Sequence, residues 1–284
     1  MKKTIDDKPT EAAGVSLLRH AVLLLFVFIS LYPVLIVFSI SLRPGNQLQS
    51  TDLSLIPENW TFDSYRSLFA EQPFLNWLGN SLLVSGIVTI TGVALASLGG
   101  YALSRYKFVG RQTLMLSILT TQMFPATMLL LPLYILIAKL HLVDTYLGLM
   151  IFYVSTALPF CIWQMKGFYD TIPPSLEEAA CIDGCGQFSA FWRIVLPVAV
   201  PGLVITALFS FMTAWSEYIV AAQVLQSRDL FTLPLGIKGF QASMSTQWGL
   251  YAAASILVSI PVVVVFIVLS RYLVSGMTLG AVKE

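Results

Sequence analysis

The sequence predicts an all-α polytopic membrane protein with six transmembrane helices, and three observations support this prediction. Hydrophobic residues make up 57% of the 284 residues and charged residues only 11%, far from the balance of a soluble domain. The mean hydropathy is +0.80. Six apolar segments are each long enough to cross about 30 Å of hydrocarbon as a helix. They lie near residues 20–42, 76–104, 112–138, 146–165, 198–224 and 249–270.

The positions of Lys and Arg predict the topology. With the N-terminus in the cytoplasm, eleven of the sixteen basic residues fall on the cytoplasmic side, which is the bias expected of membrane proteins. Both termini are therefore predicted to be cytoplasmic. The first apolar segment is not expected to be a cleaved signal peptide, because it begins some 20 residues into the chain and ends without a small-residue cleavage pattern.

The segments divide the chain into a polar N-terminal tail, 1–15, and one transmembrane domain, 16–284. Long outer loops are predicted at 43–75 and 225–247, and a C-terminal cytoplasmic tail at 271–284. The aromatic residues of the first outer loop either anchor an amphipathic segment at the membrane interface or form a docking surface for an external partner. They are Trp60, Phe62, Tyr65, Phe69, Phe74 and Trp77.

The second apolar segment is rich in small residues, which let helices approach closely in lipid. They are Gly86, Gly92, Ala94, Ala96, Ser97, Gly99 and Gly100. This face is predicted to contact another helix of the chain or a second subunit. Prolines within most segments predict kinks, because each removes a backbone donor. They are Pro33, Pro125, Pro132, Pro159, Pro201 and Pro261.

The three cysteines are predicted to be free thiols. Cys161, Cys181 and Cys185 fall at the cytoplasmic half of a segment or in a cytoplasmic loop, where disulfides are rare. No His lies near them, so no metal site is predicted.

Residues 170–197 form a polar, structured insert between the fourth and fifth segments. The Pro173–Pro174 pair predicts the end of the preceding helix, because a residue before proline is disfavoured in the helical region. Ser175 and Glu178 have capping-box spacing, so a short helix is predicted to begin there. Gly184 is placed to end this helix in the left-handed conformation.

A second helix is predicted from about Gln187, so that two helices joined at a glycine project from the bilayer. Such a helix can fit a cleft on a soluble partner and transmit its motion. Glu177, Glu178 and Asp183 would offer anionic contacts to basic residues of that partner, and Ala179–Ala180 would permit close approach. The residues alone support equally the alternative that Glu178 only caps the helix and that the alanines only favour it.

The insert resembles the EAA loop of ABC importer permeases. It reads Glu178-Ala179-Ala180, three residues, Gly184, nine residues, and then Ile194-x-Leu196-Pro197. Other segments resemble the carbohydrate-uptake branch, most of all the second, shorter permease of maltose/maltodextrin importers, and together they cover most of 15–284. They are Asn80-Ser81, 101–108, Gly110-Arg111, Phe124-Pro125, 215–218 and 276–283. One departure is Ser216, where many relatives carry Asn.

The resemblance implies half of an ATP-driven translocation pathway for a sugar or oligosaccharide in the bacterial plasma (inner) membrane. The implied partners are a second homologous permease, two ATPase subunits, an extracytoplasmic solute-binding protein and the lipid bilayer, with no nucleic acid. The ATPases would bind ATP and Mg, and no cofactor is expected in this chain, which has no GxxxxGK[ST] motif. ATPase-coupling roles are implied for Glu177, Glu178, Ala179, Ala180, Asp183, Gly184, Ile194, Leu196 and Pro197.

Three further sets of residues are candidates. Trp215, Glu217 and Tyr218 are possible pathway-lining residues; Glu217 lies within a span, where a charge is costly, so it either lines the pathway or satisfies backbone groups at a kink. The 225–247 loop either contacts the binding protein and its sugar or is only solvated, through Gln241, Ser243, Ser245, Thr246 and Gln247. The tail either contacts the ATPases or only ends the sixth span, through Gly276, Gly280 and Lys283.

Other function classes remain open. The same ABC architecture could carry a polyol, a glycerophosphodiester or a compatible solute. A stand-alone secondary transporter would normally show more intramembrane charges or an inverted repeat, and neither is evident. An intramembrane enzyme is disfavoured, since no metal pair or Ser/His/Asp set is placed for chemistry, and no catalytic residue is assigned.

Overall fold

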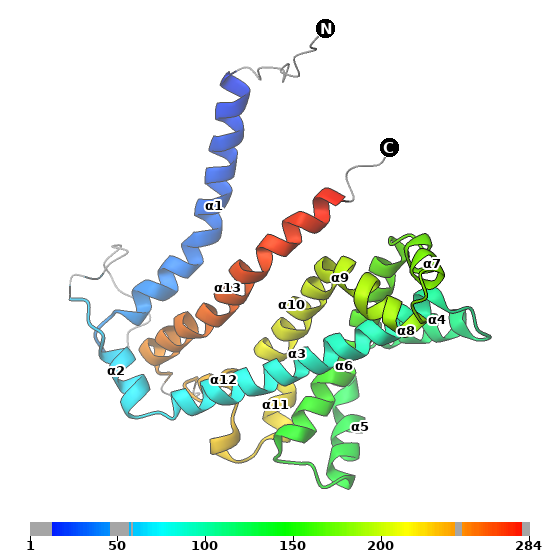
Figure 1. The fold of residues 1–284 in the computed structure, drawn as a ribbon. Coiled ribbons are helices and arrows are strands. Elements are labelled where there is room, and N and C mark those ends of the chain that lie inside the picture. Colours follow the sequence, from blue (N-terminus) through cyan, green and yellow to red (C-terminus); the bar gives the residue numbers. More distant parts are fainter. Residues whose placement is uncertain (1–12, 46–56, 58, 242–245, 280–284) are drawn as a thin grey trace.

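A computed structural model of the chain describes residues 13–45, 57, 59–241 and 246–279 (Figure 1). Among these residues, four helices are long and apolar enough to cross a membrane. They are α1 (Ala13–Ser41), α3 (Phe74–Arg105), α6 (Tyr146–Asp170) and α13 (Trp248–Leu279). A fifth span is present if the helices Gln187–Val198 and Val200–Ser216, which meet at a 77° bend, are counted as one.

The shorter elements connect these spans. They are α2 (Asp63–Ala70), α4 (Arg111–Thr121), α5 (Ala126–Lys139), α7 (Ser175–Ile182), α8 (Gln187–Ala190), a π-helical turn (Phe191–Val195), α9 (Leu196–Val198), α10 (Val200–Ser216), α11 (Ile219–Val224), a 3-10 turn (Arg228–Leu230) and α12 (Leu233–Lys238). The all-α fold class is therefore confirmed. The predicted tail 271–284 is helical as far as Leu279, and residues 280–284 lie outside the described part.

The segment 112–138 was predicted to be one span with kinks at Pro125 and Pro132, and the structure breaks it completely at Pro125. The segment is two helices, α4 and α5, separated by residues 122–125. Pro125 has no N–H to continue the helical ladder, and it disfavours helical backbone at Phe124. Its carbonyl oxygen instead accepts the Met128 N–H at 2.9 Å, which begins α5. Only the α5 part is an apolar helix of intermediate length.

The fifth predicted segment, 198–224, is also interrupted. The α10 helix stops at Ser216, and Glu217 has extended backbone, with φ −74° and ψ 128°. The segment begins at the 77° bend before Val200, where the Pro201 nitrogen cannot donate to the preceding turn. Two backbone breaks thus bound a 17-residue helix at the centre of the bundle.

The core forms where α3 packs along α6 and where α10 crosses both. The small residues of α3 permit this approach: a Cβ atom at Gly100 would lie 2.8 Å from the Lys166 backbone nitrogen, and one at Gly92 would lie 2.9 Å from Ser210 Oγ. The small-residue face is therefore an intrachain contact at these positions. Gly86 has nothing within 4 Å of such an atom, so this glycine is not needed for packing within the chain.

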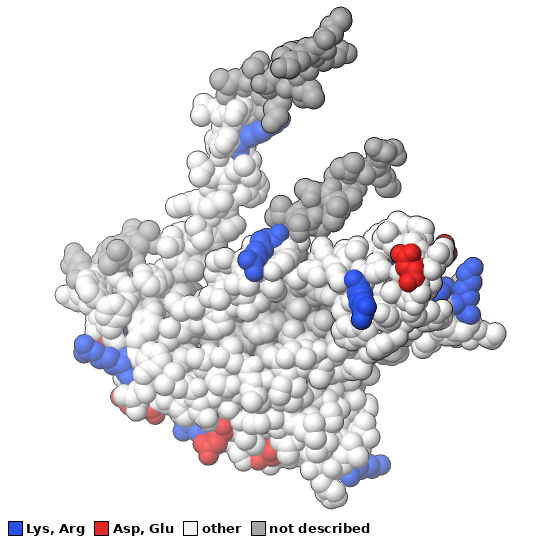
Figure 2. Space-filling view, viewed as in Figure 1, with Lys and Arg blue, Asp and Glu red and all other residues white. Residues whose placement is uncertain are grey.

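The surface is apolar between two charged ends. The α1 helix contacts α13, yet no residue in its most apolar window is buried, so lipid or another apolar protein must cover it. Figure 2 shows the Lys, Arg, Asp and Glu side chains gathered along the edges of the molecule, with uncharged surface between them. In Figure 1 the start of α1, the end of α13 and α7 lie toward one side, and α2 and α12 lie toward the other.

Candidate coupling site

The insert folds as two short helices joined at Gly184, as predicted. Gly184 has φ +90°, the Gly184 N–H donates to the Cys181 carbonyl at 3.1 Å, and the Cys185 N–H donates to the Ala180 carbonyl at 2.9 Å. These two bonds form a Schellman motif, which satisfies carbonyl groups at the helix end. The second helix, α8, begins at Gln187, also as predicted.

The predicted capping role of Ser175 is wrong. The N-cap residue of α7 is Pro174, and no side chain caps the helix. Pro174 already has helical backbone, with φ −59° and ψ −25°, so the turn starts one residue earlier than the capping-box spacing indicates. The N–H groups of Glu177 and Glu178 both donate to the Pro174 carbonyl oxygen, at 2.9 and 3.1 Å.

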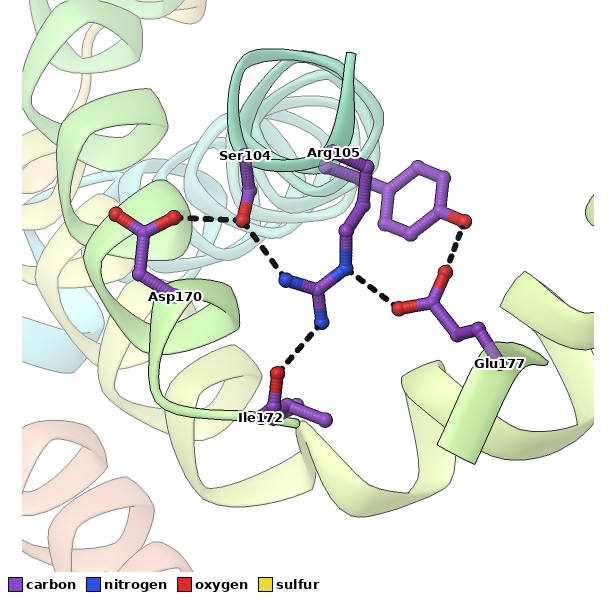
Figure 3. Close-up of polar contacts among 6 residues, drawn as sticks. Ser104, Arg105, Asp170, Ile172 and Glu177 are labelled. Carbon is purple, nitrogen blue, oxygen red and sulfur yellow. Dashed lines mark hydrogen bonds and ion pairs between the residues drawn. The ribbon is translucent and has the colours of Figure 1, made fainter. Parts of the chain in front are cut away.

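Arg105, the last residue of α3, binds the start of α7 (Figure 3). Its Nε donates to Glu177 Oε1 at 2.5 Å, and its Nη2 donates to the Ile172 carbonyl oxygen at 2.9 Å. Tyr101, one turn earlier, donates its hydroxyl to Glu177 Oε2 at 2.6 Å. The Arg105 and Glu177 side chains are 13% and 14% exposed, so water screens this ion pair only weakly. We call Tyr101, Arg105, Ile172 and Glu177 the clamp.

The clamp continues to the end of α6. Arg105 Nη1 donates to Ser104 Oγ at 3.2 Å, and Ser104 Oγ donates to Asp170 Oδ1 at 2.6 Å. Asp170 also pairs with Lys166 one turn earlier on α6. Figure 3 shows the guanidinium group of Arg105 between Asp170 on one side and Glu177 on the other. Arg105 therefore joins the end of α3 to the consecutive ends of α6 and α7, which lie more than 60 residues further along the chain.

Aromatic packing supports the clamp from below. The Tyr101 ring lies 4.6 Å from the Phe191 ring and 5.8 Å from the Tyr169 ring, centroid to centroid. The Tyr169 hydroxyl hydrogen-bonds Ser97 Oγ at 2.7 Å. All of these groups except Tyr101 are buried. The base of the insert is therefore packed against α3 and α6 rather than hinged freely on them.

The structure divides the predicted coupling residues into two groups. Glu177 was expected to offer its carboxylate to a partner, but this group is used within the chain, and Ala180 is buried at 5% exposure. Glu178, Ala179, Asp183 and Gly184 are exposed together with the apolar side chains of Ile182 and Phe188, which are 86% and 71% exposed. The outer face of α7 is thus both acidic and apolar.

Ile194, Leu196 and Pro197 occupy the π-helical turn and α9, where the insert turns into α10. Ile194 and Leu196 are half-buried, and Pro197 is exposed. These residues therefore carry the bend that leads from the insert to the central helix.

Glu217 satisfies backbone groups at a kink. Its carboxylate accepts the Val220 N–H at 2.9 Å, the Ala221 N–H at 3.1 Å and the Tyr153 hydroxyl at 2.9 Å. The side chain caps α11 directly after the chain leaves α10. This observation favours the second of the two roles predicted for Glu217.

The remaining predicted residues lie on the side opposite α7 or at the chain end. Trp215 is buried and stacks on Phe211 at 5.4 Å, whereas Tyr218 is half-buried. Gln241 accepts a hydrogen bond from Lys238, and the Gln247 N–H donates to a backbone carbonyl. Thr246 is described, whereas Ser243 and Ser245 lie outside the described residues. Gly276 lies on α13, and Gly280 and Lys283 are likewise outside.

The other end of α3 is fastened to segment 228–233. Asn80 Nδ2 donates to two carbonyl oxygens of this segment, at 2.8 and 2.9 Å, and Trp77 Nε1 donates to a third at 3.2 Å. Ser81 Oγ accepts a backbone N–H at 2.7 Å. The preceding residues 226–227 are held by Asp144, whose Oδ1 accepts two backbone N–H groups at 2.8 and 2.9 Å.

The bonds to Asp144 affect its ionisation. The Ser227 hydroxyl, together with the backbone N–H groups of Ser227 and Gln226, holds the pKa of the Asp144 carboxyl below its usual range. Asp144 has φ +58°, a left-handed conformation that aspartate tolerates. The carboxylate therefore ties two loops together on this side of the molecule.

Sequence reasoning missed the clamp. In the sequence, Arg105 indicates only topology, and the segment that contains Tyr101 and Arg105 supports only the family resemblance. Two features of the sequence could have indicated it: Tyr101 and Arg105 are one turn apart at the predicted cytoplasmic end of a span, and the cytoplasmic insert contains the acidic pair Glu177 and Glu178.

Comparisons with known proteins show the family of the chain. Residues 89–279 match the family of binding-protein-dependent transport system inner membrane components. The chain is 36% identical to the inner membrane ABC transporter permease protein YcjP of Escherichia coli, with 92% of this chain and 94% of YcjP covered. It is 36% identical to the maltose/maltodextrin transport system permease protein MalG of Escherichia coli, with 94% and 95% covered. It is 33% identical to the diacetylchitobiose uptake system permease protein DasC of Streptomyces coelicolor, with 90% and 94% covered.

The fold is also similar to that of a solved structure. One chain of a bacterial ABC transporter involved in the import of the acidic polysaccharide alginate matches with a TM-score of 0.79 and 23% identity, covering 93% of this chain and 99% of that chain. A second structure, of the alginate transporter in complex with alginate pentasaccharide-bound periplasmic protein, matches with a TM-score of 0.64. At this level of identity the likeness concerns the fold.

Proposed function

This chain belongs to the family of binding-protein-dependent transport system inner membrane components, and on that premise we propose that it forms half of the translocation pathway of an ATP-driven sugar importer. It is a permease subunit of an ABC importer, with relatives named for maltodextrin and diacetylchitobiose uptake. A di- or oligosaccharide is the cargo class that these relatives support. ATP hydrolysis, with its Mg, belongs to separate ATPase subunits.

The observation that carries the coupling part of the proposal is the exposed face of α7. Glu178 and Asp183 are exposed beside Ile182, while Glu177 on the same helix is held by Arg105. A single face therefore offers acidic and apolar contacts to an ATPase, and the opposite face fixes the helix to the membrane domain. Movement of the ATPase would pass through the clamp to α3.

The remaining partners follow from the same proposal. A second permease covers the apolar surface left open along the bundle, including part of α1, and lipid covers the rest. An external binding protein delivers the sugar on the side of α2 and α12. The N- and C-termini lie in the cytoplasm with α7, and the predicted tail residues Gly276, Gly280 and Lys283 reach the ATPases.

The experiment isolates the tagged chain gently from native membranes and identifies the subunits that co-purify. Glu178→Lys reverses a charge on the exposed face of α7, and Val109→Lys introduces a lysine at the fully exposed turn between α3 and α4. We expect the ATPase to be lost, and sugar uptake with it, only in Glu178→Lys, while both variants keep the wild-type melting temperature. Recovery of the chain alone in a form that still transports would show a stand-alone secondary transporter.

A further inference from the structure

A cavity of about 530 Å³ opens between the end of α10, α12 and the first half of α13, on the side opposite α7. This volume lies within the range of small-molecule sites, about 300–1,000 Å³. The cavity is separate from the clamp, and nothing in the proposed coupling mechanism uses it. Its walls combine aromatic rings with hydroxyl groups.

Three aromatic side chains line the cavity: Trp215 and Tyr218 from the end of α10, and Tyr251 from α13. The two tyrosines are half-buried, and neither hydroxyl bonds another described residue. The Trp215 indole is buried against Phe211, and its Nε1 has no hydrogen-bond partner among the described residues. An enclosed donor without an acceptor is unfavourable, and a ligand oxygen that reached it would remove this penalty.

Three serines add hydrogen-bond acceptors to the same walls. Ser255 and Ser259 lie one turn apart on α13, and Ser216 lies at the end of α10. Each hydroxyl donates to a carbonyl oxygen of its own helix, at 2.7 Å from Ser255, 2.6 Å from Ser259 and 2.7 Å from Ser216. Because the proton is used in this way, each oxygen is left to accept a bond from a ligand hydroxyl.

A second cavity of the same chain is mostly apolar and serves for comparison. It measures about 440 Å³ between α3, the π-helical turn and α10, and its lining is apolar except for Thr89 and Ser97. The Ser97 hydroxyl bonds the Tyr169 hydroxyl at 2.7 Å, and the Thr89 hydroxyl donates to its own helix at 2.6 Å, so Thr89 offers this groove a single acceptor oxygen. Lipid chains or a partner helix suit that groove, since neither needs acceptors. The cavity beside α13 differs by its free phenols and acceptor oxygens.

We propose that the cavity beside α13 is a carbohydrate-binding subsite on this subunit. A pyranose ring presents apolar C–H faces to aromatic rings and hydroxyls at its rim, which matches rings of Tyr218 and Tyr251 and oxygens of Ser255 and Ser259. Gln241 and Lys238 stand at the edge of the same cavity and supply further polar contacts. This inference rests on the proposed function, because it assumes that the cargo is a sugar.

The test measures protection of a cavity thiol in the complete importer, held in nanodiscs. The native thiols are first removed by Cys161→Ala, Cys181→Ser and Cys185→Ser. Uptake of maltose, maltotriose and diacetylchitobiose by the complex is compared first, and the sugar taken up fastest is chosen. A methanethiosulfonate reagent then labels Ser255→Cys in the presence and in the absence of this sugar. Val109→Cys is the control, at a turn whose side chain is fully exposed and lies outside the cavity.

We expect the sugar to slow labelling of Ser255→Cys at least fivefold and to leave labelling of Val109→Cys unchanged. Tyr251→Leu should raise the sugar concentration for half-protection about tenfold through lost stacking, and Tyr251→Phe should not. Unchanged labelling in a complex that still takes up the sugar overturns the subsite and leaves the proposed function intact. A Ser255→Cys thiol that is unreactive even without sugar, in a complex that still transports, shows a cavity filled by lipid or the partner permease and also overturns it. A complex that takes up none of these sugars overturns the proposed function itself.

Discussion

Removal of the Arg105 charge should release α7 from the membrane domain. In Arg105→Met, the side chain keeps much of its apolar volume but loses its bonds to Glu177, Ile172 and Ser104. Glu177 would then keep only the bond from Tyr101, and its carboxylate would remain largely shielded from water. An exposed pair contributes about 0.2–1 kcal/mol, whereas loss of one partner of a buried pair costs about 3–5 kcal/mol.

The clamp lies between these limits. Its side chains are 13% and 14% exposed, and Glu177 keeps the bond from Tyr101 when Arg105 is lost, so we expect about 2–3 kcal/mol of lost anchoring. Since 1.4 kcal/mol is a factor of ten, the open population of α7 should rise about 30- to 140-fold. Hydrogen exchange of the 175–190 amides in the nanodisc complex measures this population directly.

Two controls separate the clamp from general destabilisation. Lys166→Met breaks the more exposed pair with Asp170 and should change exchange by less than about fivefold, since such a pair is worth at most about 1 kcal/mol. The double variant Arg105→Met with Glu177→Leu leaves no buried charge and should recover part of the protection. Equal exchange in wild type and Arg105→Met, or faster exchange throughout α3 and α6, would refute the reasoning.

Three other predictions concern packing, capping and ionisation. Gly100→Ala should destabilise the complex by about 1–3 kcal/mol and lower its melting temperature, because the added Cβ lies 2.8 Å from α6. Gly86→Ala adds a Cβ in open space and should leave the melting temperature unchanged. Equal melting temperatures of the two variants would contradict this prediction. Glu217→Ala should lower the free energy of unfolding by about 1–3 kcal/mol, because three donors lose their acceptor. Glu217→Gln keeps an acceptor oxygen and should lower it by less; equal losses in the two variants would show that the negative charge, and not the cap, is required. The lowered pKa of Asp144 means that its bonds stabilise the loop fully above the usual aspartate pKa of about 4 and are lost as the pH falls through the lower folded value. Exchange protection of the Ser227 amide should therefore decline below about pH 4 in wild type, whereas in Asp144→Asn, whose amide oxygen can still accept this N–H, it should not depend on ionisation of residue 144; a wild type without this decline would exclude the role.

The sequence predicted those features that depend on neighbouring residues. Gly184 ends α7 because the left-handed position and both Schellman bonds lie within six residues. Prediction failed where two local signals competed. The Pro173–Pro174 pair begins the helix before Ser175, so Ser175 cannot cap it. Pro125 divides a segment that its hydropathy alone predicts to be one span. Hydropathy measures partition into lipid, and it carries no information on backbone breaks that the rest of the bundle tolerates.

The clamp was out of reach for a different reason. Arg105 and Glu177 are 72 residues apart, and nothing in the sequence links them. The sequence around Arg105 explains it as a positive charge on the cytoplasmic side of a span. The sequence around Glu177 explains it as an acidic residue in the first turn of a helix. The exposed acidic pair predicted for partner contact is thus one inward and one outward carboxylate. Which of the two turns inward depends on the rotation of α7 about its axis, and α7 is held by its packing on α8 and the π-helical turn and by the side chains of Tyr101 and Arg105 from α3.

The α3 helix explains how the two sides of the molecule can be linked. It runs for 32 residues, about 48 Å, and contains no proline, unlike α1, α5, α6 and α13. Its inner end holds α7 through Arg105, and its outer end holds segment 228–233 through Asn80 and Trp77. That segment leads directly into α12, which forms one wall of the cavity beside α13. A displacement of α7 therefore reaches the cavity wall through one unbroken helix, whereas a path through α10 would cross the 77° bend and the break at Glu217. If α3 transmits the movement, Arg105→Met and Asn80→Ala should each reduce sugar uptake per ATP hydrolysed, and the double variant should be little worse than either, because both cut the same connection.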